Sequence, residues 1–150
     1  MGSAGVERIP DDLDLPPAET LRFAQDLLNR GLAFNAHEVL ESAWKNGPSE
    51  ERMLWQGLAQ LAVGITHIQR GNPKGALTLL RRASGRIGAA ATPHGIDGPG
   101  LVAYASGLIA ELEGGAAAES LPPQRLIPKL SGSDSGAGDE RRRRPDRSDR

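Results

Sequence analysis

One short stretch of the sequence aligns a histidine, a carboxylate and an indole on one side of a predicted helix. His37, Glu41 and Trp44 stand at positions i, i+4 and i+7, which lie within roughly 60° of one another at about 100° per residue. Phe34 and Leu40 fall on the same face, so we expect the His–Glu pair on a core-facing surface. Such a pair could bind a ligand or a metal, take part in a reaction, or form a structural hydrogen-bond network.

A second polar stripe is predicted on the next helix, which we expect from Ser49 to Gly71. Gln56, Gln60 and His67 align on one side of this helix, opposite a plainly apolar face. We expect the stripe to face the His–Glu pair of the preceding helix, because a buried polar group without a partner costs roughly 1 to 3 kcal/mol. The two stripes would then form one polar centre between two helices.

This polar centre contains the ligand types of a transition-metal site. Two imidazoles and a carboxylate are a recognised ligand set for a divalent metal such as zinc, with positions left open for water. The i, i+4 spacing lets one helix supply two of the ligands. The candidate metal ligands are His37, Glu41 and His67. The supporting polar and aromatic shell is Trp44, Gln56 and Gln60.

Three interpretations of the polar centre remain open. The first is a metal-free network in which Glu41 bonds one of the histidines and the glutamines satisfy the rest. The second is metal binding, whose enzymatic form is a metal-assisted hydrolase that uses a bound water. The third is metal-free acid–base chemistry by His37 and Glu41. A zinc protease is rejected, because His-Glu-x-x-Glu lacks the second histidine of that motif. Whether the protein is an enzyme is therefore left open.

Composition limits the fold class and the partners. The chain has 150 residues, 38% of them hydrophobic but only 3% aromatic, which favours a single all-α domain of closely packed aliphatic helices. A net charge of -1 gives no electrostatic case for nucleic acid or an anionic membrane. The chain has no cysteine, and residues 1–6 lack the apolar core of a signal peptide, so we expect a cytoplasmic protein. The apolar stretch 54–68 is shorter than the roughly 20 residues that a membrane span requires.

The turn residues divide the chain into predicted elements. We expect a compact bundle of about five helices, built from antiparallel hairpins, over residues 17–114. Residues 1–16 should be an extended lead-in, and residues 115–150 a disordered low-complexity tail rich in Gly, Ser and Pro. The end residues that we predict are Gly31 as a left-handed cap, Asn35 with Glu38 as a capping box, and Asn72 as an N-cap. His94 is expected in a connecting loop.

A weak internal repeat supports the hairpin architecture. A glycine, a small residue and a leucine recur at an offset of 40 residues, as Gly31, Ala36, Leu40 and then Gly71, Ala76, Leu80. The pattern is similar to tetratricopeptide-like repeats, whose hairpins stack into binding surfaces. The alternative function is therefore a non-catalytic interaction module whose polar centre is structural. It would bind a protein partner or self-associate through its helical faces.

The quoted residues also resemble a known family. The His-x-x-x-Glu-x-x-Trp spacing of His37, Glu41 and Trp44, with its flanks and the block at residues 56–60, is similar to the bacterial and archaeal domain of unknown function 309 family. The similarity covers about residues 18–88. The resemblance implies a small all-helical domain whose motif is suggested to bind a metal and for which no reaction is established.

Overall fold

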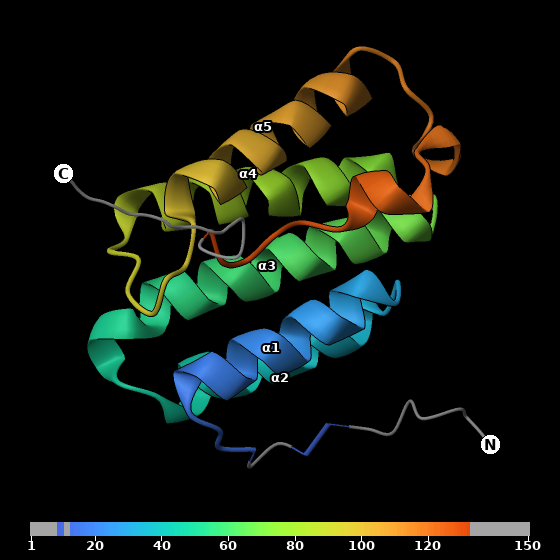
Figure 1. Cartoon of the computed structure of the whole chain (residues 1–150). Helices are drawn as coiled ribbons and strands as arrows, with labels where there is room; N and C mark the ends of the chain where they lie inside the picture. The colour runs from blue at the N-terminus through green and yellow to red at the C-terminus, as the bar shows by residue number, and fades with distance from the viewer. Residues whose placement is uncertain (1–8, 11–12, 133–150) are drawn as a thin grey trace, which may run out of the picture.

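The computed structural model describes residues 9–10 and 13–132, and its main elements are five helices joined by short connections (Figure 1). The helices are α1 (Pro17–Asn29), α2 (Ala33–Asn46), α3 (Arg52–Gln69), α4 (Pro73–Ala89) and α5 (Gly98–Glu113). Three short 3-10 turns accompany them: η1 (Ser49–Glu51), η2 (Ala118–Ser120) and η3 (Pro123–Leu126). Extended pairing in this part of the chain is limited to an antiparallel bridge between Ile96 and Ser131. The predicted all-α fold of five helices is confirmed.

Each helix packs mainly against its neighbours in sequence, so α3 lies between α2 on one side and α4 on the other (Figure 1). Two glycines of α3 allow α4 to come close. A Cβ atom added to Gly57 would lie 2.9 Å from the side chain of Ile87, and one added to Gly64 would lie 3.0 Å from that of Leu80. The side of α3 that carries these glycines is therefore the side on which α4 packs.

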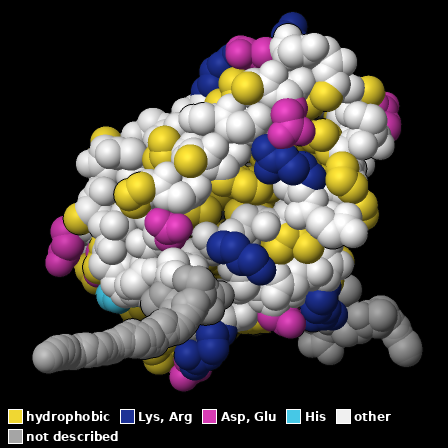
Figure 2. Space-filling view, turned by 45° about the horizontal axis from the view of Figure 1, so that its top comes forward, with side chains coloured by type: hydrophobic (Ala, Val, Ile, Leu, Met, Phe, Trp, Pro, Cys, Tyr) yellow, Lys and Arg dark blue, Asp and Glu magenta, His cyan; other side chains and the backbone are white. Residues whose placement is uncertain are grey.

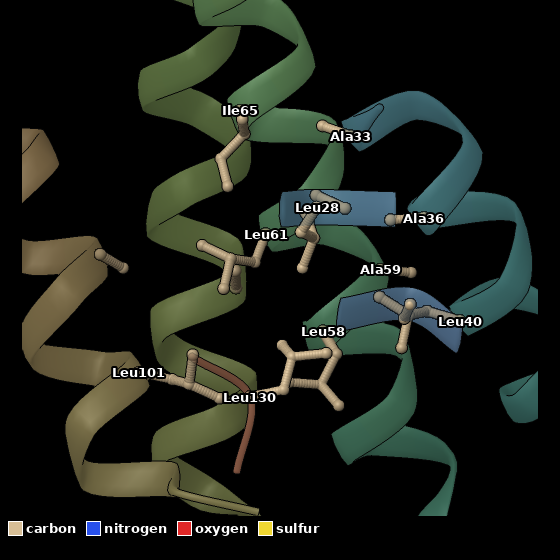
Figure 3. Close-up of a cluster of buried hydrophobic side chains, with 14 of the residues drawn as sticks. Leu28, Ala33, Ala36, Leu40, Leu58, Ala59, Leu61, Ile65, Leu101 and Leu130 are labelled. Carbon is tan, nitrogen blue, oxygen red and sulfur yellow. The ribbon is translucent and has the colours of Figure 1, made fainter. Parts of the chain in front are cut away.

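The core is built almost entirely from aliphatic side chains of all five helices (Figure 3). Leu58 and Ile65 of α3, Leu80 of α4 and Leu108 of α5 are fully buried. Burial of one such side chain contributes about 1.5 to 3 kcal/mol. On the outside, Figure 2 shows acidic and basic side chains interspersed with apolar ones over the face in view. Within the described part of the chain, no helix combines the length and the apolar character needed to cross a bilayer.

The turns that close the two hairpins have the same geometry. Gly31 and Gly71 adopt φ values of 79° and 72°, a left-handed conformation that glycine adopts without steric cost. In both turns the following residue donates its N–H back across the helix end, Leu32 to Leu27 and Asn72 to His67, at 2.8 Å in each case. The repeat seen in the sequence thus corresponds to two similar helix–turn–helix units. A tetratricopeptide-like binding function stays a prediction.

The predicted cap of the second helix was wrong. The helix begins at Ala33 after Leu32, without a side-chain cap, so Asn35 lies in its first turn and Glu38 within the helix. The left-handed turn at Gly31 redirects the chain early, and the Leu32 carbonyl already accepts the Ala36 N–H at 3.0 Å. The predicted Asn72 cap of α4 is present, since the Asn72 side chain accepts the Gly75 N–H at 3.1 Å.

The predicted disordered tail began too early. Within residues 115–132, the side chains of Ala118, Leu126 and Leu130 are buried, and Leu130 joins the core cluster shown in Figure 3. The Gln25 side chain of α1 bonds both the Pro128 carbonyl and the Leu130 N–H, at 2.9 Å each. These apolar residues are too widely spaced to form a local pattern, and only the folded helices provide the surface that buries them. Residues 133–150, which include four consecutive arginines (Arg141–Arg144), lie outside the described residues.

Candidate functional site

The predicted stripe on α2 lies at the edge of the helix packing and not in the core. His37 donates its Nδ1–H to the Phe34 carbonyl at 2.9 Å, which turns Nε2 towards Glu41. Nε2 lies 4.0 Å from Glu41 Oε1, beyond hydrogen-bond distance. Glu41 is also 3.7 Å from Lys45 Nζ, and 38% of its side chain is exposed. Trp44 is half-buried against the margin of the core. His37 is more covered, with 17% of its side chain exposed, so the α2 residues form a partly solvated set.

The polar stripe of α3 faces α4, so the expectation that it faces the α2 residues was wrong. Gln60 Oε1 accepts the Nε–H of Arg86 at 3.0 Å. His67 Nδ1 accepts the side-chain N–H of Asn72 at 3.0 Å, beside the first turn of α4. The reason is the position of the glycines: Gly57 and Gly64 share a face with Gln60 and His67, and this face admits α4. Gln56 is half-buried.

The three predicted metal ligands are therefore not brought into one group. Within residues 9–10 and 13–132, no cluster of three or more His, Asp or Glu side chains is arranged to hold a metal ion. His37 and Glu41 remain neighbours, whereas His67 is engaged with Asn72. The buried network of Glu41, histidines and glutamines is likewise not formed. Metal binding by His37 and Glu41 stays a prediction.

The structure assembles a different set of a glutamate, an indole and a histidine. Glu51 Oε1 accepts the Trp55 Nε1–H at 3.0 Å, and His94 Nε2 lies 3.0 Å from Oε2 and 3.1 Å from Oε1. The side chain of Glu51 is 17% exposed and that of His94 28%. The hydrogen bond from Trp55 lowers the pKa of the Glu51 carboxyl group; burial opposes this effect, and the hydrogen bond and charge of His94 add to it. Glu51 is therefore ionised at neutral pH.

His94 reaches Glu51 from a strained loop between α4 and α5. Its φ is 64°, a left-handed conformation that few residues other than glycine adopt, and Gly95 follows at 74°. The C-terminal segment secures this loop: the Asp97 N–H bonds the Leu130 carbonyl at 2.9 Å, and the Gly132 N–H bonds the Gly95 carbonyl at 3.2 Å. The segment that was expected to be disordered thus positions the histidine.

A pocket of about 480 Å³ opens beside Glu51, Trp55 and His94. Its outer wall is the segment 13–17, held by two side chains: Thr20 donates to the Leu15 carbonyl at 3.3 Å and Asn46 to the Leu13 carbonyl at 3.1 Å. Apolar side chains make up much of the remaining lining. The polar side chains that line it are Asp14, Thr20, Ser42, Asn46, Glu51 and His94.

Sequence reasoning missed this pocket because its partners are distant in the chain. Glu51 and Trp55 lie four residues apart at the start of the helix that was predicted from Ser49, and this spacing can be read from the sequence. His94 lies 43 residues after Glu51 in a connection that has no periodicity. The one local signal of its role was its position directly before Gly95 in a loop, where a left-handed backbone conformation can occur.

Comparisons with known proteins agree with the resemblance and name no activity. The family described as "Domain of unknown function (DUF309)" matches residues 21–79. The uncharacterized protein YpuF of Bacillus subtilis (strain 168) is 44% identical over 48 residues, which are 31% of this chain and 28% of that protein. An uncharacterized protein of Aquifex aeolicus (strain VF5) is 33% identical over 67 residues, 44% of this chain and 20% of the relative. The matched segments thus span less than a third of either relative. No solved structure matches the chain.

Proposed function

We propose that this chain, whose residues 21–79 match the family described as Domain of unknown function (DUF309), binds a small organic molecule in the pocket beside Glu51, Trp55 and His94. The observation that carries the proposal is a mostly buried carboxylate, held by an indole and an imidazole, in the wall of a pocket of about 480 Å³. Small-molecule sites typically occupy roughly 300 to 1,000 Å³ and combine apolar walls with a few convergent polar groups.

The backbone of His94 supports the same location. A left-handed conformation costs roughly 1 to 2 kcal/mol for a residue with a side chain. Such strain clusters at functional sites, where the surrounding structure holds it in place. Here the strain directs the imidazole onto Glu51 at the pocket, and the C-terminal segment stabilises the loop.

Nuclear magnetic resonance of the two indole N–H groups tests ligand binding directly. The chain has two tryptophans; Trp55 lines the pocket and Trp44 does not. Titration with 2-naphthylmethanol, a neutral probe with an apolar ring, should shift the Trp55 indole signal saturably and leave the Trp44 signal in place. Trp44→Phe assigns the two signals. Absence of a saturable Trp55 shift, or equal shifts of both signals, would contradict the proposal.

A pocket-filling substitution provides a matched control. Ala43 of α2 lines the pocket, whereas Lys45, two residues further along the helix, is exposed outside it. We expect Ala43→Phe to abolish the Trp55 shift and Lys45→Phe to retain it, with both variants helical by circular dichroism. Retention of the shift in a folded Ala43→Phe variant would place the probe elsewhere.

A second candidate function, divalent-metal binding, is favoured by the orientation of His37. A histidine that ligates a metal usually donates its other ring N–H to a carbonyl or carboxylate, which fixes the tautomer. His37 makes this contact through Nδ1 to Phe34, and its Nε2 lies 4.0 Å from Glu41 Oε1. Two bonds of about 2 Å at a tetrahedral angle place their ligand atoms about 3.3 Å apart, so the two side chains would have to approach each other by less than about 1 Å to share one zinc ion. His67 does not fit the site. A bound ion would supply an activated water for hydrolase-type chemistry.

Elemental analysis of protein purified without an affinity tag tests the metal proposal. We expect about one divalent ion per chain in the wild type and in His67→Ala, and loss of the ion in His37→Ala and Glu41→Gln. Equal loss in His67→Ala would support the original three-ligand prediction instead. A wild-type protein without stoichiometric metal, even after zinc is supplied, would contradict metal binding at this site.

A further inference from the structure

We infer that the ligand of this pocket is an organic amine in its protonated form, with an apolar body and an ammonium group directed at Glu51. The inference rests on the proposed ligand binding and names the class of ligand. Its first support is the charge of the lining: Asp14 and Glu51 are carboxylates, and within residues 9–10 and 13–132 no lysine or arginine lines the pocket. The basic side chain among these lining residues is His94, whose Nε2 already lies 3.0 Å from Glu51 Oε2, so an anionic ligand would meet a cation that is already engaged with a carboxylate.

The second support is the end of α2 in the pocket wall. Asn46 is the last residue of this helix, Gly47 follows it, and both line the pocket. The C-terminal end of a helix carries a partial negative charge and unpaired carbonyl groups, which stabilise cations and N–H donors. The N-terminal ends of α1 and η1 border the same pocket through Pro16, Pro17 and Pro48. Their positive ends weaken this effect, but proline carries no N–H to donate to an anion. The carbonyl groups of the α2 end and the two carboxylates act in the same direction.

The third support is the remaining hydrogen-bonding capacity of Glu51. An ionised carboxylate accepts about four hydrogen bonds. Oε1 accepts from Trp55 and lies near His94 Nε2, whereas among the described residues the polar contact of Oε2 is to His94 alone. These donors orient the carboxylate and leave Oε2 capacity for one ammonium N–H. The apolar body would then contact Val39 and the indole of Trp55, which line the same pocket.

A bare metal ion is a poorer match to this pocket than an ammonium group. Asp14, Glu51 and His94 lie within the described residues, and no group of three such side chains there is arranged to hold an ion. An ammonium group needs hydrogen-bond acceptors and a counter-charge, and it does not require three ligands at metal-bond lengths.

Three probes with the same ring separate the inference from the proposed function. We would measure the Kd of 2-naphthylmethylamine, 2-naphthylmethanol and 2-naphthoate at pH 7 from the Trp55 indole signal. We expect the amine to bind about 10-fold more tightly than the alcohol, an effect of about 1.4 kcal/mol, and the naphthoate to bind most weakly. Comparable affinities for the amine and the alcohol, or tighter binding of the naphthoate, would overturn the inference and leave pocket binding intact. If none of the three binds, the proposed function itself fails.

Charge-neutral variants test the role of Glu51. Glu51→Gln keeps an acceptor for Trp55 and removes the negative charge; we expect the amine affinity to fall about 10-fold and the alcohol affinity to change less than about twofold. Asp14→Asn, at an exposed position that lines the pocket, should lower the amine affinity about threefold, and it tests the charge argument even if Glu51→Gln does not fold. Glu113→Gln, at an exposed position outside the pocket, is the matched control and should change neither affinity. An amine affinity unchanged in a folded Glu51→Gln variant and in Asp14→Asn would contradict the inference.

Discussion

Two regions of the molecule contain a histidine, a glutamate and a tryptophan, and they differ in how these three groups contact one another. We call them the α2 set and the pocket set. The α2 set is His37, Glu41 and Trp44; the pocket set is Glu51, Trp55 and His94. In the α2 set the imidazole and carboxylate are 4.0 Å apart and partly solvated. In the pocket set they are 3.0 Å apart, and the carboxylate also accepts the indole N–H.

The comparison shows that alignment on one helix does not make a buried polar centre. The α2 set has ideal helical spacing, but solvent and Lys45 compete for its carboxylate. The pocket set combines a helix start with a distant loop, and packing of α4, α5 and the C-terminal segment brings these together. Four changes distinguish the two sets, from the largest expected effect to the smallest.

Removal of the indole should give the largest difference in stability between the pocket set and the α2 set. Trp55 is 2% exposed, so we expect Trp55→Ala to lower the free energy of unfolding by about 3 to 5 kcal/mol. Trp44 is only half-buried, and Trp44→Ala should cost less than about half as much. Urea unfolding followed by circular dichroism measures both. Equal losses would mean that the two indoles are equally important to packing.

Removal of the carboxylate should lower the stability less than removal of the indole does. The loss should again be larger in the pocket set than in the α2 set. Glu51→Ala leaves the buried Trp55 N–H without its acceptor, which costs about 1 to 3 kcal/mol. Glu51→Gln retains an acceptor and should recover part of this loss. Glu41→Ala removes a partly exposed ion pair and should change the stability by less than about 0.5 kcal/mol. A larger loss for Glu41→Ala than for Glu51→Ala would reverse the comparison.

When each histidine is replaced by alanine or by glycine, the order of stability of the two variants should be opposite at the two positions. At His94 the positive φ strains alanine, so His94→Gly should be more stable than His94→Ala by about 1 kcal/mol. At His37, within a helix, glycine is less favourable than alanine by about 1 kcal/mol. Thermal unfolding of the four variants measures both differences. The same order at both positions would show that the loop relaxes when His94 is replaced.

The pocket set should also produce a pH dependence. The folded state lowers the pKa of Glu51 below its ordinary value of 4.5. A lowered pKa means that the stabilisation is complete above the unfolded value and is lost as the pH falls through the folded value. The stability advantage of the wild type over Glu51→Gln should therefore shrink between pH 6 and pH 3. An advantage that stays constant over this range would show that ionised Glu51 contributes no stability.

Much of the fold could be predicted because its signals are local. The glycine turns at Gly31 and Gly71, the Asn72 cap and the periodicity of the helices each act within a few residues. The candidate site was predicted less well. The stripe with His67 was expected to face α2, but the glycines beside it admit α4, and a helical pattern alone does not say which neighbour each face meets.

By itself, the sequence determined the order and approximate extents of the helices, which faces are apolar, and that His37 and Glu41 are neighbours, because helical geometry relates residues three or four positions apart. Only the tertiary structure decided which polar groups meet. His94 reaches Glu51 across 43 positions, and Gln25 holds Leu130 across 105. Such contacts depend on how all the apolar faces pack together, since hydrophobic burial is non-directional and selects partners only through the shape of the assembled core.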